Sequence, residues 1–148
     1  PLGIEAAVTN TATVSGTGIT PVTAAETVNA EAAPNLAITK SVSPVPVTEN
    51  GTLTYTFRIQ NYGSVAATNT TGVVITDTFA PVLNNLTAAL NGTAWTAATD
   101  YTYNEATGTF SSTAGAITVP AATYTQDSTT GAWVVTPGES TLVITGTV

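Results

Sequence analysis

Short stretches that alternate apolar and polar side chains, each ended by a turn signal, run through most of the chain. The clearest is TLTYTFRIQN, Thr52–Asn61, in which every second side chain is large and apolar: Leu53, Tyr55, Phe57 and Ile59. A period of two places these side chains on one face of a β-strand, and that face is expected to be buried. The strand follows Glu49-Asn50-Gly51, a sequence that is typical of a tight turn.

About nine or ten short strands of this kind follow one another, and threonine and valine, which favour strands over helices, are abundant. The pattern predicts an all-β fold, an immunoglobulin-like antiparallel β-sandwich with an N-terminal β-strand arm. The 148 residues are enough for one such domain with a real core. One stretch differs from the rest, because Val82–Trp95 mixes leucines with asparagines, and we expect a short helical turn there.

The charge of the chain excludes several classes of partner. The net charge is −7, and the whole sequence contains two basic residues. Such a chain cannot neutralise a phosphate backbone, so we expect no nucleic-acid partner. No apolar run approaches the roughly 20 residues that a transmembrane helix needs, so we expect no membrane insertion.

Cysteine, histidine and methionine are absent. Without them the chain can form no disulfide, no zinc, haem or iron–sulfur site and no catalytic triad that needs histidine. We therefore expect no cofactor, no metal site and no enzymatic activity beyond a reaction of the chain with itself. The composition suits an extracellular protein, since many exported proteins avoid cysteine and methionine, which oxidise.

The single lysine of the chain lies on an apolar strand. The sequence LAITKSV, Leu36–Val42, places Lys40 on the same face as three aliphatic side chains, Leu36, Ile38 and Val42. We expect this face to be buried. An amine at a core position needs either a partner or a reaction.

Two further alternating stretches, residues 4–15 and 20–28, precede this strand and are joined by the turn signal SGTG. The small polar sequence NAEAAPN, residues 29–35, follows as a linker. Each stretch has one mostly apolar face that contains a single polar side chain. These faces consist of Val8, Asn10, Ala12 and Val14 in the first stretch and Val22, Ala24, Glu26 and Val28 in the second.

The sequence LAITKSVSPVPVTENGTLTYTFRIQNYGSVAATNTTGVVITDTFAP resembles the immunoglobulin-like repeat of bacterial and archaeal surface proteins known as domain of unknown function 11. The shared elements are the Thr-Lys strand, the Gly-x-x-x-Thr-Tyr strand from Gly51 to Asn61 and the Val-x-Ile-x-Asp strand. The later pieces YNEATGTF, TVPAATYT and PGESTLVITGTV are similar to the long variant in tandem arrays on Firmicute surfaces. The resemblance implies an extracellular structural domain on a bacterial cell surface or spore surface.

The order of the pieces departs from the pattern of this family. There, an element like VTNTATVSG normally follows TLVITGTV and closes the domain, whereas here it lies at the N-terminus. We therefore expect a donor-strand arm with its linker, residues 1–33, and a sandwich that lacks its closing strand, residues 34–148. The chain starts at Pro1 with no visible signal peptide, so we expect a processed form, a fragment or one repeat of a longer protein.

A sandwich that lacks its last strands exposes sheet edges and an apolar groove. A neighbouring copy can fill the groove with its own arm, residues 1–30, in donor-strand complementation. Such a head-to-tail contact builds a filament if it does not close into a ring. One alternative is an arm that folds back onto its own sandwich. The other is that the displaced element only reflects where the chain was cut.

Three polar residues occupy inward-facing positions of apolar strands: Lys40, Asp77 and Asn10. Burial favours a neutral amine, which is a nucleophile, and a neutral carboxylic acid, which can polarise an amide. Lys40 can then attack the side chain of Asn10 and expel ammonia, forming a Lys–Asn isopeptide cross-link similar to those of Gram-positive pilins. Asp77 is the expected acid and Glu26 a second candidate. The alternatives are a Lys40–Asp77 salt bridge or a lysine whose amine reaches solvent.

Together these features predict a structural subunit of an extracellular fibre or pilus-like appendage, with copies of itself as its partner. The alternative is one repeat of a large bacterial surface adhesin that acts as a spacer or binding module. A sugar-binding platform would support the second function, and its candidate residues are Trp95, Tyr101, Tyr103 and Trp133. Aromatic side chains in a small sandwich more often belong to the core.

Overall fold

The computed structural model of the chain describes residues 6–30 and 32–148. The predicted arm residues at positions 1–5, including the start of the first expected strand, and Glu31 of the linker lie outside these ranges. The described fold is all-β with antiparallel sheets, as predicted, and it contains one short 3-10 helix, η1 (Asn69–Thr71). Its arrangement is compatible with an immunoglobulin-like sandwich.

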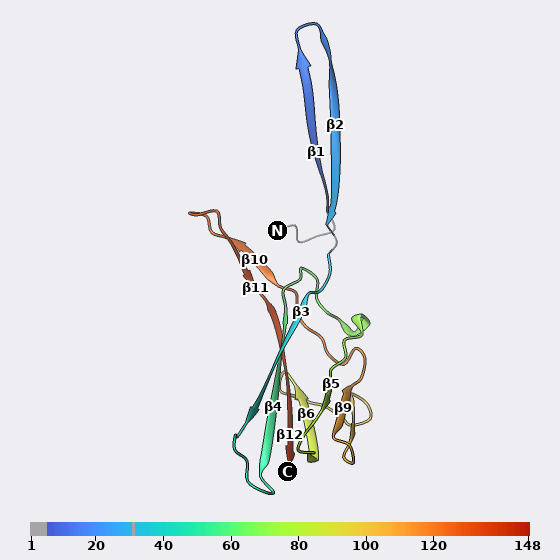
Figure 1. Cartoon of the computed structure of the whole chain (residues 1–148), viewed down its shortest axis with the longest axis vertical. Coiled ribbons are helices and arrows are strands. Elements are labelled where there is room, and N and C mark those ends of the chain that lie inside the picture. Colours follow the sequence, from blue (N-terminus) through green and yellow to red (C-terminus); the bar gives the residue numbers. More distant parts are fainter. Residues whose placement is uncertain (1–5, 31) are drawn as a thin grey trace.

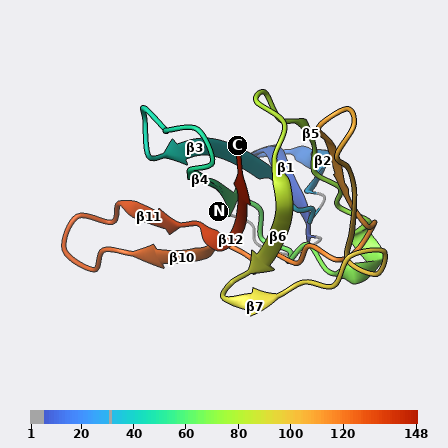
Figure 2. The ribbon, with the colours of Figure 1, turned by 90° about the horizontal axis from the view of Figure 1, so that it is seen from below.

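Two sheets of unequal size form the sandwich (Figures 1 and 2). The larger has five strands in the order β3 (Leu36–Ser43), β4 (Thr52–Asn61), β12 (Gly138–Thr147), β6 (Asn84–Leu90) and β7 (Thr93–Ala94). The smaller has three, in the order β5 (Thr76–Thr78), β9 (Thr109–Ser112) and β8 (Tyr101–Asn104). The strands β3 and β5 are therefore the outermost strands of their sheets.

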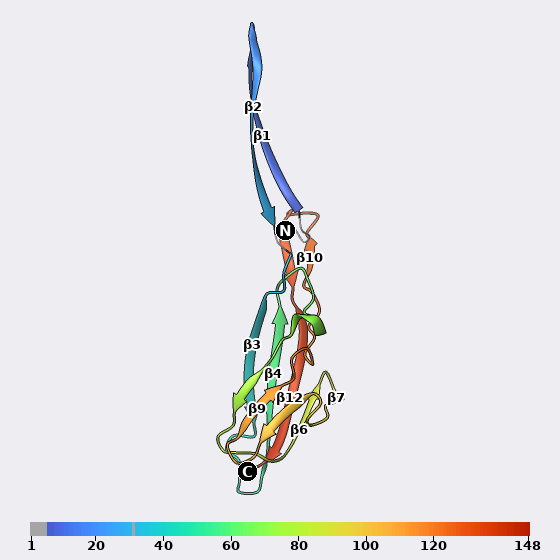
Figure 3. The same cartoon turned by 90° about the vertical axis from the view of Figure 1, so that its right-hand side faces the viewer.

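Two β-hairpins extend from this body. The strands β1 (Ala6–Gly16) and β2 (Ile19–Ala30) pair with each other and point away from the sandwich along its long axis (Figures 1 and 3). The strands β10 (Thr123–Gln126) and β11 (Trp133–Thr136) form a second projecting hairpin near the base of the first. The turn after β1 falls where SGTG predicted it.

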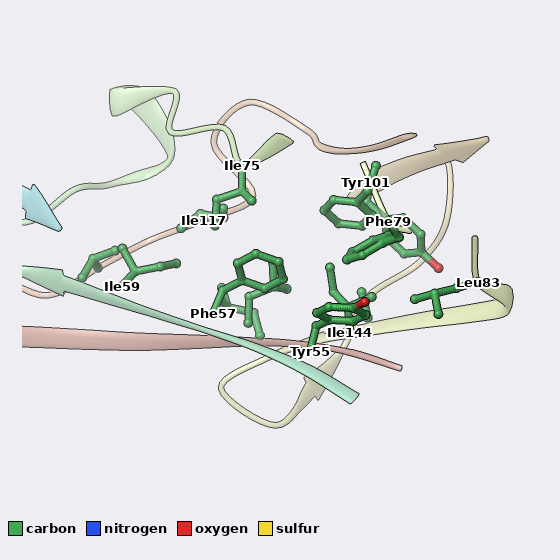
Figure 4. Packing of buried hydrophobic residues seen from close by; sticks show 14 of the residues in the cluster. Tyr55, Phe57, Ile59, Ile75, Phe79, Leu83, Tyr101, Ile117 and Ile144 are labelled. Atoms are coloured by element: carbon green, nitrogen blue, oxygen red, sulfur yellow. The ribbon is translucent and has the colours of Figure 1, made fainter. Parts of the chain in front are cut away.

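The core lies between the two sheets and follows the two-residue period of the sequence. All four apolar side chains predicted to face inward from β4 are buried. Cross-strand pairing places Phe57 opposite Leu142 and Tyr55 opposite Ile144. The smaller sheet and its loops contribute the facing layer (Figure 4), with Ile75, Phe79, Phe110 and Ile117. Each such side chain contributes about 1.5–3 kcal/mol when it is fully removed from water.

The expected helical turn in Val82–Trp95 is wrong, because this stretch forms the β6–β7 hairpin. The hairpin turns at Asn91-Gly92, both with positive φ, which is the sequence and geometry of a tight β-turn. Ala88 and Leu90 alternate with exposed or half-buried residues in β6 and join the core. The Asn-Gly pair was the local signal for a hairpin.

Asn61 at the end of β4 is fully buried and fixes the point where the linker enters the body. Its side-chain oxygen accepts hydrogen bonds from the backbone N–H groups of Asn35 and Gly63, both at 2.9 Å. Its amide nitrogen donates to the carbonyl oxygens of Val65 and Pro120, at 2.8 and 3.0 Å. One side chain thus joins the linker, the turn after β4 and the loop before β10.

Replacing Asn61 with alanine should leave four buried or half-buried backbone groups without their hydrogen-bond partner. We expect Asn61→Ala to lower the free energy of unfolding by at least about 2 kcal/mol, measured by urea denaturation. The matched control is Asn69→Ala, since Asn69 is exposed. Equal stability of the two variants would contradict this role of Asn61.

Candidate functional site

The expectation that Leu36, Ile38, Lys40 and Val42 face a buried core is wrong. Every residue of β3 is exposed, and the Ile38 side chain is 53% exposed. The strand pairs with β4 on one side, and in the described part of the chain no strand pairs with its other side. The alternation of β3 correctly gives one apolar face, but the smaller sheet does not extend far enough to cover it.

A groove runs beside this uncovered face. It has a volume of about 170 Å³ and is lined by apolar residues from β3, β4 and the extended segment before β5: Leu36, Ala37, Ile38, Ile59, Val73, Val74 and Ile75. The groove therefore lies between the edges of the two sheets, on the open side of the sandwich.

The second wall of the groove is the outer edge of β5 and of the segment before it, and no strand within residues 6–30 and 32–148 pairs with this edge. Ile75 accepts a hydrogen bond from the N–H of Ser112, and the N–H of Phe79 donates to Gly108, both at 2.9 Å and both toward β9. Backbone groups of alternate residues point to opposite sides of a strand, so those of Val74 and Thr76 point away from β9. Such an edge is a template for an additional strand.

Lys40 and Asp77 meet across the open side, at one end of the groove. The Lys40 Nζ donates to Asp77 Oδ2 at 2.5 Å, which links β3 of one sheet to β5 of the other. The same nitrogen lies over the rings of Tyr55, Phe79 and Phe57, 4.8, 5.3 and 5.5 Å from their centres. The aromatic faces add a cation–π attraction. The lysine side chain is 41% exposed, so the pair is accessible to a reagent or to another chain.

Asn10 and Glu26 meet on the β1–β2 hairpin. The two residues are directly opposite each other in the strand register, so their side chains share one face. The same face carries Val14 and Val22, which are 68% and 66% exposed. The opposite face is rich in threonine, and the hydroxyl groups of Thr9 and Thr27 are hydrogen-bonded there at 2.8 Å.

The structure thus brings Lys40 to Asp77 and Asn10 to Glu26, but it keeps the two pairs on different parts of the chain. The hairpin points away from the sandwich, and it does not fold back over β3 and β5 (Figures 1 and 3). Within one chain, Lys40 therefore does not reach Asn10 in this arrangement. The groove residues Val73–Ile75 were not predicted, although their alternation in GVVITDTF was the available signal.

The other basic residue, Arg58, lies outside this site. It donates to the carboxylate of Glu139 on the outer face of the larger sheet, and Gln60 donates to the same carboxylate at 2.8 Å. The hydrogen bond from Arg58 holds the pKa of Glu139 below its usual range. This pair therefore contributes to stability at neutral pH and loses that contribution as the pH falls.

The four aromatic residues considered for a sugar-binding platform do not form one surface. Tyr101 is buried against Phe110, with ring centres 5.4 Å apart, and Trp95 stacks on Tyr101 from the edge of the core. Trp133 is exposed on the separate β10–β11 hairpin.

Neither a membrane-spanning helix nor a cluster of metal-binding side chains is present in residues 6–30 and 32–148. No protein-family model, no curated protein and no solved structure matches the chain.

The Lys40–Asp77 pair should contribute modestly to the stability of the free subunit, because solvent screens it. In a double-mutant cycle with Lys40→Met and Asp77→Asn, we expect a coupling energy of about 0.5–1 kcal/mol. Thermal unfolding at a concentration where the chain is monomeric measures it. The comparison cycle is Arg58→Met with Glu139→Gln, which should give the smaller coupling. A larger coupling for the outer pair would contradict this ranking.

Proposed function

We propose that the protein is a structural subunit of an extracellular fibre or pilus-like appendage, on a bacterial cell or spore surface. Subunits assemble head-to-tail when the β1–β2 hairpin of one copy enters the groove of the next. The observation that carries this proposal is the exposed apolar face of β3 beside a free strand edge. Both features are completed by one added β-hairpin.

The β1–β2 hairpin has the properties expected of the donor in such an assembly. It extends away from its own sandwich, and one of its faces is apolar and uncovered. Inserted into a second copy, it would supply main-chain hydrogen bonds to the free edge and apolar side chains to the groove, as in other donor-strand complexes. Exposed apolar surface on both partners would be buried in a single step.

The donor and acceptor surfaces are different parts of the same chain. A contact between unlike surfaces leaves one free donor and one free acceptor in every assembly, so growth continues in a line unless it closes into a ring. The anchored linker supports this geometry. A side chain at Gly63 would meet the Ala33 carbonyl oxygen at 2.1 Å, so the linker fits tightly against the body where the hairpin leaves.

A Lys40–Asn10 isopeptide bond between copies would lock the fibre. The chain has no cysteine, so a disulfide cannot provide this cross-link. The reaction occurs once per site, and the protein is therefore a self-modifying subunit and not a turnover enzyme. The resemblance to immunoglobulin-like surface repeats also supports an extracellular structural role.

The second candidate function is a repeat of a large surface adhesin that acts as a spacer or binding module. In that case the hairpin of an adjacent repeat in one longer polypeptide would fill the same groove. The groove supports both functions, but the adhesin repeat would be a soluble monomer after excision, whereas the subunit would form fibres.

A charge in the donor face or in the acceptor groove should abolish assembly. We expect linear fibres of the unchanged protein by negative-stain electron microscopy, and monomers for Val14→Asp and for Ile38→Asp, because burying an unpaired carboxylate is costly. Ile38 and Val14 are exposed in the free subunit, so both variants should fold.

The matched controls place the same charge on the opposite face of the same strands. Thr13→Asp and Thr39→Asp should retain fibres, with circular dichroism confirming that all four variants are folded. Fibres from Ile38→Asp, or a monomeric unchanged protein, would reject donor-strand assembly through this groove.

A further inference from the structure

The groove has a polar end and an apolar end. Lys40 and Asp77 face each other at the polar end. Away from this pair, both flanking segments continue with an apolar side chain at every second position: Ile38 and Leu36 on β3, and Ile75 and Val73 beside β5. The two segments therefore run in the same direction along the groove.

The apolar face of the β1–β2 hairpin has the same order. The polar pair Asn10–Glu26 is followed, toward the tip of the hairpin, by the cross-strand pairs Ala12–Ala24 and Val14–Val22. The spacing along any strand is the same, about 3.3 Å per residue. One alignment consequently brings polar side chains to polar side chains and apolar side chains to apolar side chains at every level.

We propose that β1 of one copy pairs antiparallel with the free edge of Val73–Asp77 in the next copy, with Asn10 opposite Asp77. Ala12 then lies opposite Ile75, and Val14 lies opposite Val73. This register rests on the fibre assembly proposed above and specifies its contact. The reverse direction would place Ala12 opposite Phe79, which is already buried in the core, and Val14 opposite Pro81, outside the groove.

The register also gives the fibre a consistent polarity. The tip of the incoming hairpin points to the Leu36 end of the groove, which is the end where the linker of the acceptor joins its body. The hairpin of the acceptor leaves from that end (Figure 1). The hairpin that a copy receives and the hairpin that it donates therefore point in the same direction, as an open filament requires.

Docking completes a site of four side chains, two from each copy. In the free subunit, the amine of Lys40 is paired with Asp77 and partly exposed to water, and the Asn10 amide lies on the projecting β1–β2 hairpin. An incoming hairpin covers the ion pair and removes this water. Desolvation favours transfer of the Lys40 proton to Asp77, which leaves a neutral amine beside a neutral acid.

The neutral amine then attacks the Asn10 side chain. A bond forms between Lys40 Nζ and Asn10 Cγ. Glu26, which docking would cover together with Asn10, donates a hydrogen bond from its protonated carboxyl group to the developing negative charge on Oδ1. Asp77 gives its proton to Asn10 Nδ2 and accepts one from Nζ. The Cγ–Nδ2 bond breaks, ammonia leaves, and both carboxyl groups end protonated as they were at the attack. The free subunit stays unreactive because its Lys40–Asp77 pair and its Asn10–Glu26 pair lie apart.

Mixing two full-length variants tests whether the site is shared between copies. Lys40→Met keeps the donor hairpin but has no nucleophile, and Asn10→Ala keeps the nucleophile but has no target. Neither variant alone should give covalent species in boiling detergent. Their mixture should give covalent dimers and nothing larger, with the summed mass less one ammonia and a Lys40–Asn10 peptide after digestion. Fibres of the unchanged protein without any ammonia loss would overturn the site but leave donor-strand assembly intact. A protein that forms no fibres would overturn both.

The role of Glu26 is tested in the same mixture. Glu26→Gln in the donor variant should slow dimer formation about 100-fold, the usual lower range for loss of an acid catalyst, while electron microscopy still shows non-covalent fibres. The control is Glu105→Gln, an exposed residue away from the groove, which should not change the rate. An unchanged rate with Glu26→Gln would overturn the assignment of Glu26.

The absence of native cysteine allows the register to be tested without the isopeptide chemistry. In the Lys40→Met background, a Val14→Cys chain mixed with a Val73→Cys chain should form disulfide-linked dimers on oxidation. The same donor mixed with a Val42→Cys chain should not, because Val42 lies beyond Lys40 at the other end of β3. Dimers with Val42→Cys in place of Val73→Cys would overturn the proposed direction.

Discussion

The mismatch between a five-stranded and a three-stranded sheet is the constraint on which the rest of the structure depends. An apolar sheet face must be covered, and an edge must find hydrogen-bond partners or meet water. The central strands β4 and β12 satisfy both conditions, because the smaller sheet and its loops lie over them. The outermost strand β3 does not, so its apolar face, the groove and the free edge of β5 all follow from two sheets that end at different places.

Much of this fold is encoded locally and could be predicted. The alternation in β4 correctly gives the inward-facing residues, and the turn sequence SGTG correctly gives the β1–β2 hairpin. Parity also identifies the side chains on the inward face of each strand, so the sequence alone indicates that Lys40 and Asp77 can pair, and the structure contains that contact. The alternation of side chains between the two faces is a property of each single strand, so it does not depend on how the strands pack.

What could not be predicted is which faces are covered, since coverage depends on segments far apart in the sequence. Leu36 and Leu53 stand at similar alternating positions, yet Leu53 is 4% exposed and Leu36 is 37% exposed. Only the place of each strand in its sheet separates them. Asn61 shows the converse, because a polar residue at the end of a strand is fully buried when four backbone groups from distant segments converge on it.

The positions of the proposed cross-links determine how a fibre of such subunits would carry force. Each chain would be bonded to one neighbour through Asn10 and to the other through Lys40, so the covalent path between the two bonds runs only through residues 10–40. Tension then passes along the hairpin, the linker anchored by Asn61 and the first half of β3. The rest of the sandwich lies outside that path and need not unfold under load. In such a fibre the role of the sandwich would be to form the groove that aligns the donor hairpin, and the cross-links would let a protein without disulfides resist extension at the marginal stability usual for a single domain.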